Sequence, residues 1–120
     1  MGATRTHKDL MAWQESLRLV ETVYRRTSEF PHEEAFGLTA QMRRAAISVP
    51  SNIAEGAGRA SPKELAQFVN IASGSLAELE TQIEIAARLG YLRTDATLLH
   101  EVVRVGKLLT GSQKILQKSR

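Results

Sequence analysis

The sequence predicts an all-α fold, an antiparallel up-and-down four-helix bundle that forms a single domain over residues 1–120. Three observations predict it. Apolar residues recur three and four positions apart in four segments, which is the spacing of one face of a helix. Short connections of about four to six residues join these segments, and such links make sequential helices antiparallel neighbours. No segment has the alternating apolar and polar pattern of a strand.

We expect the first helix over about residues 9–28. Its apolar residues form one stripe, so we assign Trp13 and Tyr24 to the core. Phe30 precedes Pro31, and a residue before proline is pushed out of the helical region, which ends the helix. The stripe consists of Leu10, Trp13, Leu17, Val20 and Tyr24.

We expect the second helix over about residues 33–57, with Glu33 and Glu34 in its first turn, where the helix dipole favours negative charge. Pro50 interrupts it and costs about 3 kcal/mol in a regular helix. Because the apolar stripe continues in phase across Pro50, we favour one helix kinked near this residue. The alternative is two helices broken at Val49. The stripe consists of Met42, Ala46, Val49, Ile53 and Gly56.

The third helix, about residues 62–89, has the clearest start. Ser61 is the expected N-cap, Pro62 takes the first helical position, and Glu64 completes a capping box. Gly90 ends the helix. The buried stripe is Leu65, Val69, Ala72, Leu76, Leu79, Ile83 and Ala86.

The fourth helix is expected over about residues 94–117, with Thr94 as its N-cap. Its apolar residues cover a wide arc: Leu98, Leu99, Val102, Val103, Val105, Leu108, Leu109, Ile115 and Leu116. Helices two to four are thus more apolar than a four-helix core needs. The excess favours burial against other subunits, and the alternative is a wider core.

The composition predicts a cytoplasmic protein without a membrane segment. There are no cysteines, which excludes disulfides and thiolate chemistry and fits a reducing compartment. No apolar run approaches the roughly 18 residues that a membrane span requires.

We expect no catalytic residue, no metal site and no cofactor. None of the three histidines, His7, His32 and His100, has the preceding glutamate that a di-iron bundle enzyme needs. The serines have no nearby histidine to act as a base. We therefore interpret the chain as a protein that is not an enzyme.

Basic residues make RNA a candidate partner, and the net charge is +3. Aromatic residues are only 5% of the chain, so a base-stacking platform is not expected. Binding would be to phosphates and would weaken steeply with salt. The candidate residues are Arg25, Arg26, Arg43, Arg44, Arg59, Lys63, Arg104 and Lys107.

A polar row follows the second helix, opposite its apolar stripe. It is either a solvated face with weak ion pairs, or an ordered polar network at a subunit contact or ligand surface. The row consists of Gln41, Arg44, Ser48, Asn52, Glu55 and Arg59.

Four stretches resemble the bacterial four-helix bundle proteins known from intervening sequences in 23S ribosomal RNA genes. They are DLMAWQ at 9–14, GLTAQMRRAA at 37–46, SVPSNIAEG at 48–56 and GSLAELETQ at 74–82. The resemblance covers residues 7–117 and departs at Ser73, where the family often has arginine. It implies an antiparallel bundle assembled as a ring of five subunits. The accessory protein of diversity-generating retroelements, which associates with a reverse transcriptase and RNA, is distantly similar.

The leading interpretation is a non-enzymatic oligomeric bundle, a homopentamer by resemblance, that binds RNA or a nucleoprotein partner through basic surface. The alternative is a structural or protein-interaction module in which the polar row serves assembly. Loss of RNA affinity with rising salt distinguishes the two.

Overall fold

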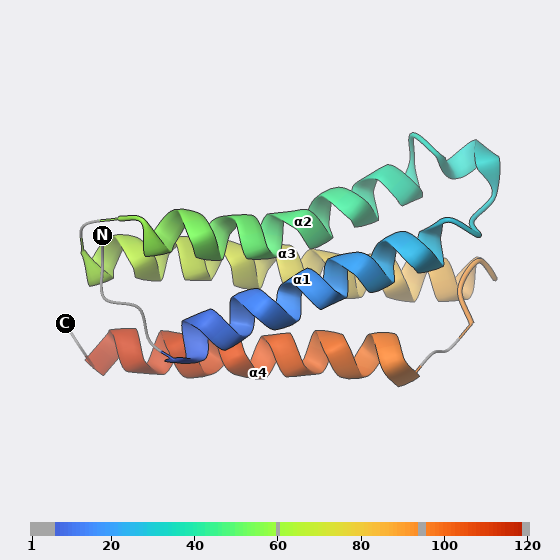
Figure 1. Ribbon diagram of the computed structural model, residues 1–120. Coiled ribbons are helices and arrows are strands. Elements are labelled where there is room, and N and C mark those ends of the chain that lie inside the picture. Colours follow the sequence, from blue (N-terminus) through green and yellow to red (C-terminus); the bar gives the residue numbers. More distant parts are fainter. Residues whose placement is uncertain (1–6, 60, 94–95, 119–120) are drawn as a thin grey trace.

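Four α-helices and one short 3-10 helix make up the computed structural model, which describes residues 7–59, 61–93 and 96–118 (Figure 1). They are α1 (His7–Thr27), η1 (His32–Glu34), α2 (Leu38–Ala57), α3 (Pro62–Arg88) and α4 (Ala96–Lys118). No strand occurs among these residues. The predicted all-α four-helix fold is confirmed.

The helices form an elongated bundle with extents of 45 × 25 × 18 Å. In Figure 1, α1 runs from left to right, α2 returns, α3 runs to the right again, and α4 returns beneath them. Helix α1 packs against α2 and α4, and α3 packs against the same two helices. Neighbours in sequence are therefore neighbours in space, and the last helix closes the bundle against the first.

The face that α1 buries differs from the predicted one. Ala12, Leu19 and Val23 are buried. Four residues of the predicted stripe are at least about one-third exposed, so their assignment to the core was wrong: Leu10, Trp13, Leu17 and Tyr24. Helix α1 has two faces with the same spacing, and the buried one also contains the small hydroxyl residues Ser16, Thr22 and Thr27. Ser16 and Thr27 donate to carbonyls of their own helix, Trp13 O at 2.8 Å and Val23 O at 2.7 Å, which allows their burial.

Helix α2 begins at Leu38 rather than at Glu33, because the chain first makes the η1 turn. The Glu34 carboxylate accepts from Leu38 N at 3.2 Å, and so satisfies one of the free amides at the helix start. Tyr91 Oη donates to the other Glu34 oxygen at 3.1 Å. This hydrogen bond raises the pKa of Tyr91, because deprotonation would place two negative charges together. Glu34 thus caps α2 from outside the helix.

Pro50 lies within one continuous helix, so the alternative of two helices broken at Val49 was wrong. Two side chains donate to carbonyls one turn away: Ser51 Oγ to Ile47 O at 2.7 Å, and Asn52 Nδ2 to Ser48 O at 2.8 Å. These carbonyls follow Ala46 O, the acceptor that would pair with an N–H at position 50, so the two bonds add to the helix beside the missing one rather than replace it. The kink itself stays a prediction.

Helices α2 and α3 pack most closely at Gly56. A Cβ at this position would lie 2.8 Å from Phe68 Cβ and 3.0 Å from Leu65 Cδ1. The start of α3 is as predicted, because Ser61 Oγ accepts from Glu64 N at 3.2 Å. Its end is also as predicted: Gly90 has φ +80°, and Tyr91 N donates back to Ala86 O at 2.9 Å.

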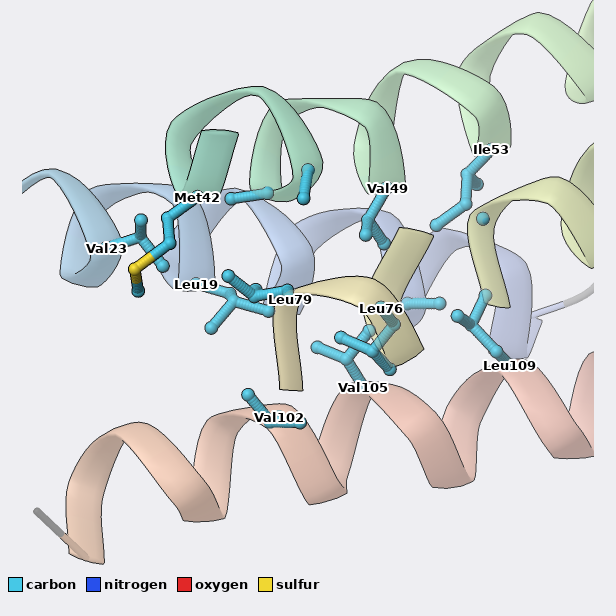
Figure 2. Packing of buried hydrophobic residues seen from close by; sticks show 14 of the residues in the cluster. Leu19, Val23, Met42, Val49, Ile53, Leu76, Leu79, Val102, Val105 and Leu109 are labelled. Atoms are coloured by element: carbon cyan, nitrogen blue, oxygen red, sulfur yellow. The ribbon is translucent and has the colours of Figure 1, made fainter. Parts of the chain in front are cut away.

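The core fills the space between the four helices (Figure 2). The predicted stripes of α2 and α3 are all buried. On α4, Leu98, Val102 and Leu109 are buried, whereas Leu99 and Val103 are exposed. The Thr94 cap lies outside the described residues. None of the described helices is long and apolar enough to span a membrane.

Candidate functional site

The eight basic candidate residues lie in separate groups. Arg25, Arg26, Arg43 and Arg44 are near the end of α1 and the start of α2, whereas Arg59 and Lys63 flank the connection at the opposite end. Arg104 and Lys107 lie on α4. Along α2, the 16 residues from Arg43 to Arg59 correspond to roughly 24 Å. A single subunit therefore does not bring the candidates together in one patch.

Arg43 binds the protein itself. Its Nε donates to Thr27 Oγ1 at 2.9 Å, its Nη2 donates to Tyr24 O at 3.3 Å, and its guanidinium carbon lies 4.4 Å from the centre of the Tyr24 ring. These contacts include a cation–π interaction and hold α2 against the end of α1. Arg43 is thus fixed in place.

Three other candidates also have partners within the chain. Arg59 lies 3.5 Å from Glu55 and stacks on Phe68 at 4.9 Å. Arg104 lies 3.3 Å from Glu15, and Arg25 donates to Thr22 at 3.2 Å. Arg44, Lys63 and Lys107 are exposed, as are Arg25 and Arg104.

The middle of the polar row forms a network that also includes Ser75 of α3. The Ser48 and Ser75 hydroxyls lie 2.7 Å apart, and Asn52 Nδ2 donates to Ser48 Oγ at 2.9 Å. All three residues are half-buried, whereas Gln41 and Glu55, which lie before and after the network in the row, are exposed. The network therefore joins α2 to α3 within one subunit. Ser75 was missed because nothing in its local sequence identifies a partner 27 residues away.

A charged hollow of about 430 Å³ lies between α1 and α4. Thr22 Oγ1 is 2.8 Å from Glu101 Oε1, which joins the two helices. Its lining mixes both signs: Glu15, Arg18, Glu21, Thr22, Arg25 and Glu101. Among the described residues, no group of three or more histidine, cysteine or acidic side chains could hold a metal ion. The mixed charges and the Thr22–Glu101 hydrogen bond fit a packing contact between α1 and α4.

An apolar groove of about 300 Å³ lies between α1 and α2; we call it the α1–α2 groove. Its polar side-chain groups are few, and the Ser51 hydroxyl is turned back to Ile47 O at 2.7 Å. Sequence reasoning missed the groove because it placed the outward stripe of α1 in the core. The lining residues are Trp13, Leu17, Val20, Ile47, Pro50, Ser51 and Ala54.

Comparisons with known proteins agree on a family. The family model described as "23S rRNA-intervening sequence protein" matches residues 8–111. A crystal structure of a protein of unknown function from the S23 ribosomal protein family, from Bacteroides thetaiotaomicron, is similar in fold. The TM-score is 0.81 at 22% identity, covering 89% of this chain and 98% of that one. A comparison with curated proteins gives no match. The chain belongs to the family of 23S rRNA-intervening sequence proteins.

Proposed function

We propose that the chain is a non-enzymatic, cytoplasmic subunit of a homo-oligomer, a ring of five copies, whose exposed apolar surfaces are buried between subunits. The observation that supports this most is the α1–α2 groove. Its residues Trp13, Leu17 and Ile47 are 36%, 38% and 42% exposed in the single chain. Contiguous apolar patches of this kind on soluble proteins mark interaction surfaces.

Other exposed apolar side chains extend the surface available for assembly. Ile71, Ile85 and Leu89 lie on or at the end of α3, and Leu99 and Val103 lie on α4. Each of these side chains is about half exposed, so its burial contributes roughly 0.7–1.5 kcal/mol, half of the value for a fully exposed side chain. Apolar surface on several sides suits a ring, because each subunit of a ring contacts two neighbours through different surfaces.

Light scattering on the purified protein tests this assembly. We expect a mass of five times the 13.2 kDa of one chain. Apolar burial changes little with salt, so the mass should persist at high ionic strength. A mass of one chain at micromolar concentration contradicts the assembly, and another multiple contradicts the number five alone.

A second proposed function is phosphate binding to RNA, or to a nucleoprotein partner, through the exposed cations. The supporting observation is that Arg44, Lys63 and Lys107 are exposed and lie on three different helices. A symmetric oligomer repeats each of them once per subunit. The assembled particle would thereby offer the basic surface that one subunit lacks.

Affinity for a structured RNA should fall steeply between low and high salt. Lys63→Ala and Lys107→Ala should each weaken binding and lower the slope of log affinity against log salt by about one per subunit in contact. Arg88→Ala is the control, because Arg88 Nε already lies 2.9 Å from Glu84. An affinity that does not change with salt, or an equal effect of Arg88→Ala, contradicts the phosphate proposal.

A further inference from the structure

Phe36 is the most exposed large apolar side chain among the described residues, at 99%. It lies between η1 and α2, directly before Gly37. A phenylalanine that becomes buried removes about 150–250 Å² from water, so leaving the ring in solvent has a substantial free-energy cost. The ring therefore projects as an apolar knob from one end of the bundle.

We propose that Phe36 of one copy inserts into the α1–α2 groove of a neighbouring copy. This inference rests on the proposed homo-oligomer and names the contact within it. The groove is apolar and open, and its volume of about 300 Å³ is large enough to accept an aromatic ring. The same chain thus carries both an apolar knob and an apolar groove.

Charge complementarity supports this occupant. Glu33, three residues before Phe36, is exposed beside the knob. Beyond Val20 and Ile47, the two faces that line the groove continue to Tyr24 and Arg43, where the guanidinium lies on the ring. The Glu33 carboxylate would therefore meet a groove that ends in a fixed cation, and this pairing also favours one orientation.

The contact must be between copies. Phe36 is almost fully exposed, so it does not occupy the groove of its own chain. Phe36 precedes α2 by two residues, and Ile47 lies nine residues after the helix start at Leu38, which corresponds to roughly 14 Å of helix. Because knob and groove are different patches, the contact is heterologous, the type that generates a ring when its rotation closes.

The area that one phenylalanine side chain buries is too small for a stable interface, because stable interfaces bury about 1,200–2,000 Å² in total. Phe36 would instead act as a central anchor, as large side chains in fully desolvated pockets do. The outward stripe of α1 supplies neighbouring apolar area through Leu10 and Tyr24, which are 44% and 39% exposed.

Phe36→Ala tests the anchor. Trp13 lines the groove and is the sole tryptophan of the chain, so its fluorescence reports on what covers the groove. We expect Phe36→Ala to lower the mass measured by light scattering and to shift the Trp13 emission to longer wavelength. Helical circular dichroism should stay unchanged, because the ring touches little of its own subunit. Phe36→Leu, which keeps an apolar knob, should retain most of the mass.

Disulfide trapping then locates the knob. The chain has no cysteines, so Glu33→Cys and Ile47→Cys place one thiol three residues before the knob and one at the Arg43 end of the groove without background. On mixing and oxidation, we expect a covalent dimer of twice 13.2 kDa that neither variant gives alone. Gln67→Cys, on the exposed surface of α3, replaces Ile47→Cys in the control and should give none.

The outcomes separate the inference from the proposed function. An oligomer that keeps its mass and its Trp13 emission with Phe36→Ala overturns the knob contact and leaves the assembly standing. Absence of the mixed disulfide in an oligomer, or cross-linking of Glu33→Cys alone, also overturns it. A wild-type monomer overturns both proposals.

Discussion

Gly56→Ala is expected to destabilise the bundle by about 1–3 kcal/mol, although glycine to alanine in a helix normally stabilises. The reason is the close approach of α2 and α3. The new Cβ would lie 2.8 Å from Phe68 Cβ and 3.3 Å from the Leu65 carbonyl oxygen, atoms that cannot move without their backbone. The two helices would have to separate, and packing around Gly56 would be lost.

Gly74→Ala is the matched control within α3. A Cβ at Gly74 meets nothing within 4 Å, so only the higher helix propensity of alanine should act. The free energy of unfolding should therefore rise by about 0.5–1 kcal/mol. Urea unfolding at one fixed protein concentration measures both variants, since assembly makes stability depend on concentration. Changes of the same sign in the two variants contradict the close helix contact.

Leu79→Ala is expected to cost about 2–5 kcal/mol, because it leaves a cavity in the middle of the core. Leu79 is fully buried on α3, and it points into the space between the helices with Leu19 and Val102 (Figure 2). Leu79→Met, which conserves volume, should cost under about 1.5 kcal/mol, and it tests the same position if Leu79→Ala does not fold.

Gln67→Ala supplies the surface comparison on the same helix. Gln67 is exposed, so its replacement should change the free energy of unfolding by no more than about 0.5 kcal/mol. Thermal and urea unfolding followed by circular dichroism give the two values. A Leu79→Ala variant as stable as Gln67→Ala would contradict the core described here.

The sequence predicts the buried face where one apolar stripe runs regularly along the whole helix. In α2 and α3 such a stripe is present, and Met42, Val49 and Leu76 are buried as expected, although Ile71 and Ile85 add exposed apolar surface outside it. Helix α1 has two faces with this spacing, and the face with smaller residues is buried because small residues let helices approach. Trp13 was assigned to the core because it lies in the stripe of apolar residues that recur three and four positions apart.

Local sequence patterns could not predict features that depend on residues far apart in the chain. Helix α2 starts at Leu38 rather than at the predicted Glu33, because the Glu34 carboxylate caps the helix. Tyr91, 57 residues away, donates a hydrogen bond to the same carboxylate. The basic residues were identified by type, but their separation depends on which helix ends meet. Ser48 was identified, whereas its partner Ser75 required the packing of α2 on α3.

The contacts of Tyr91 have a consequence for the end of the bundle that presents Phe36. Tyr91 bonds to Glu34 at 3.1 Å, and its ring centre lies 5.7 Å from that of Phe30, so the connection after α3 braces the turn between α1 and α2. Conformational entropy at this turn is lost during folding rather than on association. A surface that is preorganised in this way can bind with little ordering, and its dissociation rate then depends on the contacts made rather than on a flexible loop.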